Sequence, residues 1–288
     1  MAPFKVVVHP LTSEPTDSSH SPSLTAYESE PFSSPNALVF IHGLTAGPHT
    51  TDLTHLQAAL PSEYSIWELR MRSSYSGWGY SSLDNDVQDL TRLVRYLRED
   101  LKIKRIVLMG ASTGCQGALE YNNHSSQPPR VDGYILTSPV SDREAANTLW
   151  SSEALAESLA VAKELIDQGK ECVTMPKKHV PFLQRQSRRR DGGALLPLDY
   201  FASDISDEVL ADKFGRVNKP LLILPAEKDE MVPASVDKQL LLERWSTAAP
   251  KGVVSELSGF IPDADHVVSS SEAQKWLAER VAKFLSSI

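Results

Sequence analysis

A single serine, Ser112, stands between two glycines directly after a run of apolar residues. The stretch reads VLMGASTGC, and its centre fits the pattern Gly-x-Ser-x-Gly. In that pattern a sharp turn from strand to helix holds the serine hydroxyl above a sheet in a strained backbone conformation. Glycines are needed on both sides because side chains there would collide with the neighbouring strand or helix. The alternative is an ordinary tight turn in which the serine caps the helix that follows.

A serine hydroxyl is a weak nucleophile until a general base takes its proton. A catalytic function for Ser112 therefore requires a histidine that a carboxylate orients. In chains that carry this turn the order is serine, acid and histidine, with the histidine near the C-terminus. Of the eight histidines, His266 in DADHVVSS is the one that follows residue 217. We predict His266 as the base, with a histidine in a surface loop as the alternative.

The acid is predicted to be Asp229, in LLILPAEKDEMVP, where an apolar stretch ends. A short carboxylate just past a strand end reaches a histidine ring from a fixed backbone position. Glu227 and Glu230 are rivals in the same loop, and the alternative for both is solvated surface charge. Asp142, which follows another apolar stretch, is the second candidate.

Acyl transfer also needs hydrogen-bond donors for the oxyanion that forms on the carbonyl oxygen. The backbone N–H of Thr113 supplies one at the start of the predicted helix, where the helix dipole also favours negative charge. We assign the second to the N–H of Leu44 in VFIHGLTAG, an apolar strand followed by a flexible turn. His42 in this turn is expected to brace the loop rather than to act as a base.

Residues of the same regions could belong to two other kinds of site, a metal site or a phosphate-binding loop. A metal site could involve His42, His49, His55 and Asp52, but their spacing does not match a ligand pair on one helix. No paired cysteines and no His-x-His pattern support it. The glycines around Ser112 do not form a phosphate-binding loop, because the lysine that follows the second glycine in such loops is missing. We therefore predict no metal.

Composition argues against several classes of partner. The 288 residues carry a net charge of -8, which gives no attraction to nucleic acid or to an anionic membrane. No apolar run approaches the ~20 residues of a membrane span, and the N-terminal apolar run is too short for a secretion signal. The two cysteines, Cys115 and Cys172, make no disulfide framework. We expect a cytoplasmic protein with reduced thiols that binds neither nucleic acid nor membrane.

Strands are expected to alternate with helices along the chain. The clearest helix spans Leu83 to Leu97, where apolar residues recur at helical spacing and Ser81 with Asp84 makes a capping box. Alternation implies parallel pairing and crossover helices, hence an α/β fold with a doubly wound, mostly parallel sheet. The predicted strands are Lys5–Val8, Leu24–Tyr27, Ala37–Ile41, Ser65–Leu69, Ile106–Met109, Tyr134–Thr137, Leu221–Leu224 and Val253–Leu257.

One segment, residues 141–217, interrupts the alternation. It carries one long helical pattern that ends at Gly169, followed by the basic run Arg185 to Arg190. Because the segment lies between two predicted strands, we interpret it as a helical cap over the strand ends. The chain is then a single domain, in which the core parts at residues 1–140 and 218–288 flank the cap insertion.

The motifs HGLTAG, GASTG, KDEMVP and DADH stand in this order, and with them the chain resembles the α/β-hydrolase superfamily over nearly its full length. More narrowly, RMRSSYSGWGYSSL, SPVSDRE and DYFASDISDE resemble stretches of a fungal and plant family of poorly characterised hydrolases. That family includes intracellular fungal enzymes that hydrolyse the ester bonds of fusarinine-type hydroxamate siderophores. The resemblance implies the α/β-hydrolase fold, no cofactor, and a triad of Ser112, Asp229 and His266.

The function expected from these observations is hydrolysis of a small-molecule ester by a serine hydrolase that forms a covalent acyl-enzyme. Esters of hydroxamate siderophores are the candidate substrates. A thioesterase or acyltransferase of secondary metabolism would use the same triad and is the first alternative. A ligand receptor that keeps the pocket without the chemistry is the second, and an intact triad argues against it.

Aromatic residues are expected to line the substrate pocket. The candidates are Tyr75, Trp78, Tyr80, Trp150 and Phe182. For each of them the alternative is packing in the core. Nothing in the sequence sets an oligomeric state.

Overall fold

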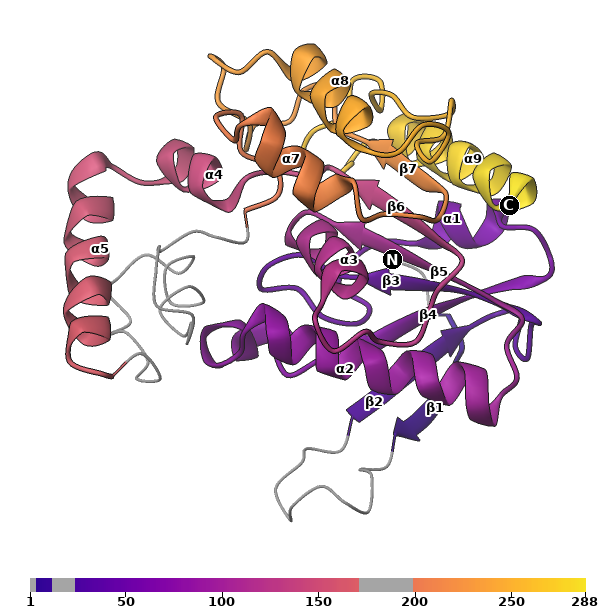
Figure 1. Cartoon of the computed structure of the whole chain (residues 1–288). Coiled ribbons are helices and arrows are strands. Elements are labelled where there is room, and N and C mark those ends of the chain that lie inside the picture. The colour runs from indigo at the N-terminus through magenta and orange to yellow at the C-terminus, as the bar shows by residue number, and fades with distance from the viewer. Residues whose placement is uncertain (1–3, 12–23, 171–198) are drawn as a thin grey trace.

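Seven strands form one sheet in the order β1-β2-β4-β3-β5-β6-β7 (Figure 1). The computed structural model describes residues 4–11, 24–170 and 199–288, apart from the side chains of residues 79 and 80. β2 pairs antiparallel with β1 and β4, and all pairs from β4 to β7 are parallel. The strands are β1 Val6–Leu11, β2 Leu24–Ser29, β3 Asn36–Ile41, β4 Tyr64–Arg70, β5 Arg105–Ala111, β6 Gly133–Thr137 and β7 Leu221–Leu224. The predicted mostly parallel sheet is confirmed.

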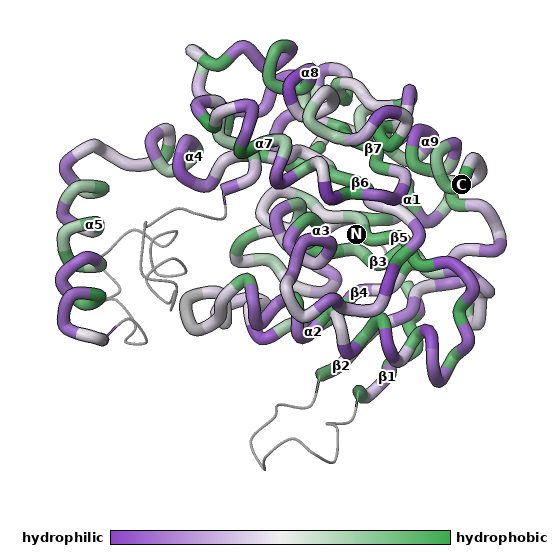
Figure 2. The backbone as a smooth tube through the Cα atoms, viewed as in Figure 1, coloured by the Kyte–Doolittle hydropathy of each residue, from purple (hydrophilic) through white to green (hydrophobic). Residues whose placement is uncertain are grey.

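Helices cover both faces of the sheet, as a doubly wound fold requires. Side chains alternate along β3, so Val39 and Ile41 belong to one core and Leu38 and Phe40 to the other. The first core includes residues of α2, α3, α7 and α8, and the second includes residues of α1 and α9. The central strands are hydrophobic along their length, as buried parallel strands are (Figure 2). These helices are α1 Thr54–Ala59, α2 Leu83–Arg95, α3 Thr113–Asn123, α7 Asp207–Phe214, α8 Lys238–Ala248 and α9 Ser271–Ser287.

Short irregular turns flank α2. A 3-10 turn, Tyr75–Tyr80, precedes the helix, and a π turn, Tyr96–Asp100, follows it. The helix begins one residue later than the predicted capping box implies. Ser82, not Ser81, is the cap, and its hydroxyl accepts from the N–H of Asn85 at 3.2 Å. Both serines fit the capping pattern, and only the backbone conformation selects between them.

The predicted strand Val253–Leu257 is wrong. This segment meets β7 through one isolated bridge at Val254. A turn closes within it, because the N–H of Ser258 donates to the carbonyl oxygen of Ser255 at 2.9 Å. The Ser258 hydroxyl, rather than a backbone group, then accepts from the N–H of Ile223 at 3.0 Å. The turn takes the backbone out of register with β7, so a regular ladder does not form.

Two helices, α4 Asp142–Leu149 and α5 Ser152–Asp167, occupy the first part of the segment predicted as a cap. The single helical pattern is broken at Ser151, whose hydroxyl accepts from the N–H of Ala154 at 3.3 Å and caps α5. Beyond α5, Gly169 has φ +65° and ends the helix, as predicted. α5 stands away from the sheet and its covering helices in Figure 1.

Polar contacts join the start of this segment to residues 199–203, which precede α7. The Ser141 hydroxyl donates to Asp199 Oδ2 at 2.5 Å. Glu144 Oε1 accepts from the N–H of Ser203 at 2.9 Å and from its hydroxyl at 2.5 Å. These residues belong to the stretches SPVSDRE and DYFASDISDE, so the two motifs lie against each other in space although more than fifty residues separate them in the sequence.

The helices in the described residues are all too short or too polar to cross a bilayer. Cys115 is a free, buried thiol, and Cys172 lies outside the described residues. The cytoplasmic location stays a prediction.

Candidate active site

Ser112 forms the sharp turn between the end of β5 and the start of α3. Its backbone has φ 55° and ψ -125°, a conformation that costs a non-glycine residue roughly 1–3 kcal/mol. A Cβ at Gly110 would lie 2.4 Å from the carbonyl oxygen of Gly114, and one at Gly114 would lie 2.2 Å from that of Ile41. Neither glycine position accepts a side chain, as the sequence predicts. The capping alternative is wrong, because the Ser112 side chain makes no capping hydrogen bond.

The Ser112 hydroxyl instead contacts the imidazole of His266. Its Oγ lies 2.8 Å from Nε2 of the ring. On the other side of the ring, Nδ1 lies 3.0 and 2.9 Å from Oδ1 and Oδ2 of Asp229, which is 4% exposed. A carboxylate only accepts hydrogen bonds, so Nδ1 donates its proton, and Nε2 is left to accept from the serine hydroxyl. This arrangement orients the imidazole toward the hydroxyl.

The two glutamates that rivalled Asp229 hold the loop that carries His266. Glu230 Oε2 accepts from the backbone N–H of His266 at 2.9 Å. Glu227 Oε2 accepts from the N–H of Asp263 at 2.8 Å. Both glutamates therefore bind main chain, whereas Asp229 binds the ring.

Asp142, the second candidate acid, occupies a different part of the site. It is the first residue of α4, and its Oδ2 accepts from the Gln116 side-chain amide at 2.8 Å. Gln116 lies on α3, so this contact joins α4 to the helix that follows Ser112. The geometry thus favours Asp229 as the partner of the histidine.

The predicted oxyanion donors lie beside Ser112. Gly43 passes so close that a Cβ on it would lie 3.1 Å from the Ser112 Cβ. Leu44, the next residue, lines the same cavity as Ser112. Thr113 is the first residue of α3, so its N–H has no acceptor within the helix. The positive end of the α3 dipole adds a potential that favours an anion at this point.

The turn that carries Leu44 is held from both ends. His42 Nε2 lies 2.8 Å from the Ser74 hydroxyl, and His42 Nδ1 lies 2.9 Å from the carbonyl oxygen of Gly43. Farther along, Glu68 of β4 accepts from the backbone N–H of His49 at 2.9 Å. The bracing role predicted for His42 is confirmed.

The histidines of the rival metal site point to separate partners. His49 Nδ1 lies 2.8 Å from Glu68 Oε2, and His55 Nε2 lies 3.0 Å from the Ser271 hydroxyl. His42 contacts Ser74, as described above. Among the residues that the structure describes, no three His, Cys, Asp or Glu side chains come close enough to share a metal ion.

A cavity of about 790 Å³ opens beside Ser112 and His266. Its walls come from the turn after β3, the segment through α1, the ends of β5 and β6, α4 with Trp150, and the start of α9. Apolar side chains such as Phe40 and Leu277 make up much of the wall. The cavity falls in the usual size range for binding sites of small molecules.

Of the aromatic residues predicted for the pocket, Trp150 lines this cavity. Tyr75 does not line the cavity, contrary to the prediction. Its hydroxyl donates to a backbone carbonyl of the turn after β3 at 2.8 Å. Trp78 lines a separate and much smaller cavity. Phe182 and the side chain of Tyr80 lie outside the described residues.

Sequence reasoning missed Thr137 and Ser138, which line the cavity from the end of β6. In the sequence Thr137 is only the last residue of a predicted strand. The signal that could have found it is its place at the carboxyl end of the strand next to β5, where parallel sheets bind ligands.

Cys115 lies near Ser112 in the first turn of α3 but does not compete with it. Burial raises the pKa of its thiol well above the usual range. The thiol also donates to the carbonyl oxygens of Gly110 and Thr137, at 3.2 and 3.3 Å. A protonated thiol is a poor nucleophile, so Cys115 is no rival to the nucleophile predicted at Ser112.

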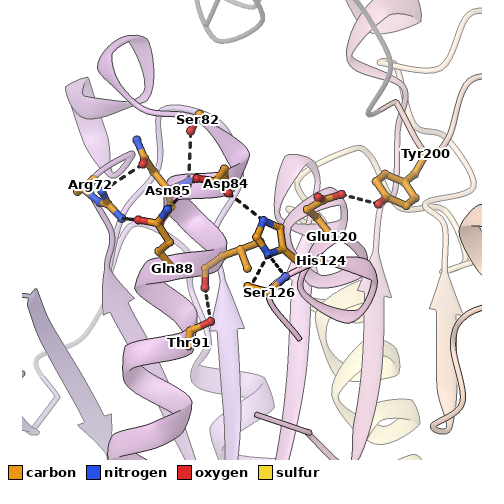
Figure 3. Close-up of polar contacts among 11 residues, drawn as sticks. Arg72, Ser82, Asp84, Asn85, Gln88, Thr91, Glu120, His124, Ser126 and Tyr200 are labelled. Atoms are coloured by element: carbon orange, nitrogen blue, oxygen red, sulfur yellow. Dashed lines mark hydrogen bonds and ion pairs between the residues drawn. The ribbon is translucent and has the colours of Figure 1, made fainter. Parts of the chain in front are cut away.

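Figure 3 shows a second group of serine, histidine and aspartate, none of which lines the cavity. His124 Nε2 lies 2.8 Å from Asp84 Oδ1, and its Nδ1 lies 2.7 Å from the Ser126 hydroxyl. Ser126 is exposed and does not follow a strand. The group joins the first turn of α2 to the end of α3, and we interpret it as a structural contact.

Comparison with known proteins places the chain in a family. Residues 7–286 match the family described as "Protein of unknown function (DUF1749)". The chain belongs to this family. A relative, "Fusarinine C esterase sidJ" of Aspergillus fumigatus, is 31% identical over 88% of this chain and 90% of its own length. The narrower resemblance carried by the three sequence stretches is thereby confirmed.

Solved structures agree with the fold of this DUF1749 member. The "Siderophore hydrolase EstB from Aspergillus fumigatus" aligns with a TM-score of 0.78 and 28% identity, covering 99% of this chain and 98% of the other. An "Alpha/Beta hydrolase fold protein of unknown function" aligns with a TM-score of 0.73 and 18% identity, covering 100% and 97%. The α/β-hydrolase fold predicted from the motifs is confirmed.

Proposed function

We propose that this DUF1749 member is a serine esterase in which Ser112, His266 and Asp229 form the catalytic triad. The observation that carries the proposal is the contact of 2.8 Å between Ser112 Oγ and His266 Nε2 at a strained turn between strand and helix. The α/β-hydrolase fold and the esterase and hydrolase among the similar proteins support ester hydrolysis as the class of reaction.

Acylation begins when Ser112 Oγ attacks the carbonyl carbon of the ester while His266 Nε2 takes the hydroxyl proton. The carbonyl oxygen becomes an oxyanion, to which the N–H groups of Leu44 and Thr113 donate. Asp229 stabilises the imidazolium through Nδ1. The bond between carbon and alcohol oxygen then breaks, the imidazolium gives its proton to that oxygen, and the acyl group stays on Ser112.

Deacylation repeats these steps with water in place of the serine. His266 Nε2 takes a proton from the water, whose oxygen attacks the carbonyl carbon of the acyl-enzyme. The second oxyanion accepts hydrogen bonds from the same two N–H groups. The bond between the carbonyl carbon and Ser112 Oγ then breaks, and the imidazolium returns the proton to Ser112 Oγ. The acid product leaves, and the enzyme is restored to its starting state.

The same triad would serve a thioesterase or an acyltransferase, which differ in the leaving or the accepting group. Hydrolysis of oxygen esters is favoured because the relative that aligns over most of both chains is "Fusarinine C esterase sidJ". A receptor without chemistry is disfavoured because His266 and Asp229 are both aligned on the Ser112 hydroxyl.

We further propose hydroxamate siderophore esters of the fusarinine type as substrates. Two similar proteins support this, one named for fusarinine C and one named a siderophore hydrolase. The cavity of about 790 Å³ has room for the reacting part of such a compound. The basic run Arg185 to Arg190 lies outside the described residues.

The cap interpretation of residues 141–217 is part of the proposal. Three of the described residues of this segment line the cavity beside Ser112: Asp142, Ala145 and Trp150. A segment that supplies one wall of the cavity is placed to select among substrates, as loops at the strand ends of α/β folds do.

A timed digest of a cyclic fusarinine-type triester, followed by mass spectrometry, tests the proposal. The wild-type enzyme should release linear and then monomeric products, and Ser112→Ala should release none. If short acyl esters are cleaved while the siderophore stays intact, the substrate proposal fails and the esterase proposal stands. If Ser112→Ala retains hydrolysis, the triad itself fails.

A further inference from the structure

Two residues that line the cavity beside Ser112 carry buried hydroxyls with no hydrogen-bond partner among the described residues. The two residues are Thr137 and Ser138, which are 4% and 2% exposed. Leaving a buried hydroxyl unpaired is unfavourable, because the group loses its hydrogen bonds to water and gains none in return. Each such group in a native site needs an explanation.

Both hydroxyls stand next to the nucleophile. Thr137 pairs with Ala111 in the sheet register, and its carbonyl oxygen accepts from the N–H of Ser112 at 3.0 Å. Ser138 follows directly, and its N–H donates to the carbonyl oxygen of Leu224 at 2.9 Å. These backbone contacts hold both residues at the carboxyl edge of the sheet, so any group that meets their side chains also lies close to the scissile bond.

Packing alone does not explain a threonine at position 137. Side chains two residues apart on a strand share a face, and Ile135 is buried in the apolar core on that face, as is Leu224 on the neighbouring strand. Valine has the same shape as threonine and no polar atom, so it would fill this position at least as well. Neither packing nor a hydrogen bond within the described residues thus accounts for the hydroxyl.

The backbone conformation of Ser138 also indicates a function for its side chain. Its φ is 47°, in the left-handed region that residues other than glycine, asparagine and aspartate rarely adopt. A glycine would adopt this conformation without strain. A serine there gives a residue that lines the cavity a hydroxyl at a conformational cost, as residues at ligand sites do.

We propose that the hydroxyls of Thr137 and Ser138 bind a second polar group of the substrate, beside the scissile ester. This inference rests on the proposed function and adds a substrate class to it. Because Asp52 and Asp142 also line the cavity, an anionic group is disfavoured. The group recognised is neutral and bears an oxygen that accepts hydrogen bonds, such as the carbonyl of an amide.

Matched substrates separate this recognition from catalysis. One pair is p-nitrophenyl pentanoate and p-nitrophenyl N-acetylglycinate, which place a hydrocarbon or an amide at equal distance on the acyl side. The second pair is the butanoate ester of 1-pentanol and that of N-(2-hydroxyethyl)acetamide, which does the same on the alcohol side. For each pair the quantity measured is kcat/KM for the amide-bearing ester divided by kcat/KM for its hydrocarbon partner.

In Thr137→Val this ratio should fall by about tenfold for the pair whose amide reaches the hydroxyls, the loss expected for one good hydrogen bond. Ser138→Ala should lower the ratio for the same pair, as should Ser138→Gly, which also relieves the backbone strain. Thr91→Val is the matched control, because its hydroxyl donates to the carbonyl oxygen of Val87 at 2.7 Å on α2 (Figure 3), and its ratio should not change.

A ratio that stays unchanged for both pairs in Thr137→Val and in Ser138→Ala would overturn the proposal. Thermal unfolding of each variant shows whether the comparison is made on folded protein, and Ser138→Ala keeps the test available if Thr137→Val does not fold. Loss of all hydrolysis in Ser112→Ala tests the triad separately. An inactive Ser112→Ala together with unchanged ratios would therefore reject this recognition site alone.

Discussion

Glu230 accepts the backbone N–H of His266 at 2.9 Å, while its chain neighbour Asp229 accepts the ring Nδ1–H of the same histidine. Two consecutive carboxylates thus hold one histidine, one through the main chain and one through the imidazole. In the proposed triad the carboxylate at the ring sets the tautomer and stabilises the imidazolium, whereas the one at the main chain positions the loop. Equal charges next to each other in the sequence therefore have unequal roles.

Asp229→Asn should lower kcat by roughly a thousandfold or more, because an amide can donate to the ring and stabilise the wrong tautomer. Glu230→Gln should lower kcat by less than about tenfold, since its amide oxygen still accepts the backbone N–H of His266. Steady-state kinetics on one chromogenic ester, with both variants at equal concentration, makes the comparison. If Glu230→Gln lowered kcat more than Asp229→Asn, the acid would be Glu230 rather than Asp229.

Ser112 should be the residue that reacts with a fluorophosphonate probe, because its hydroxyl has a base within hydrogen-bond distance and donors for an anionic oxygen nearby. Intact-mass analysis should show one adduct on the wild type and none on Ser112→Ala. Ser126→Ala is the matched control, because Ser126 also contacts a histidine but lies outside the cavity, and it should label like the wild type. Labelling that persists in Ser112→Ala would exclude Ser112 as the nucleophile.

Local patterns explain why the residues of the proposed triad could be selected from the sequence. The turn at Ser112 needs two glycines, Asp229 follows the apolar strand β7, and His266 is the histidine nearest the C-terminus. Only the structure distinguishes Asp229 from Glu227 and Glu230. All three are carboxylates of the same loop, and they differ in the direction in which their side chains point. Which carboxylate reaches the imidazole depends on contacts across 37 residues of sequence.

Other features depend on neighbours that the sequence does not show. The segment Val253–Leu257 has the composition of a strand, but the turn between Ser255 and Ser258 prevents regular pairing with β7. Thr137 looks like an ordinary strand residue, and its unpaired hydroxyl becomes visible only when its neighbours are known. The helical pattern after Ser141 shows no break, although Ser151 caps a new helix.

Gly114→Ala should destabilise the protein by about 1–3 kcal/mol or more, because the new Cβ would meet the carbonyl oxygen of Ile41 at 2.2 Å. Gly117→Ala is a matched control in the same helix, since its Cβ would lie 3.7 Å from the Ile41 side chain in ordinary contact. Replacing a helical glycine by alanine should stabilise that variant by roughly 0.5–1 kcal/mol. Urea unfolding measures both changes, and equal effects would contradict the close approach of α3 to β3.

The buried carboxyl of Glu68 holds the turn after β3 through the backbone N–H of His49. Burial raises the pKa of Glu68 above its ordinary value of 4.5, although its contacts with His49 act in the opposite direction. A carboxyl with a raised pKa binds its proton more tightly in the folded than in the unfolded protein. Its contribution to stability is therefore complete below about pH 4.5 and is lost as the pH rises through the raised value.

Glu68→Gln removes this titration and keeps an oxygen that accepts the N–H of His49. Going upward from pH 4.5, the Tm of the wild type should fall relative to that of Glu68→Gln, and thermal unfolding at a series of pH values measures the difference. A constant offset between the two curves reports lost packing, so only a change in their separation bears on the carboxyl. Glu63→Gln is a matched control on an exposed side chain and should run parallel to the wild type. Parallel curves for Glu68→Gln as well would show that the Glu68 carboxyl titrates alike in the folded and unfolded protein.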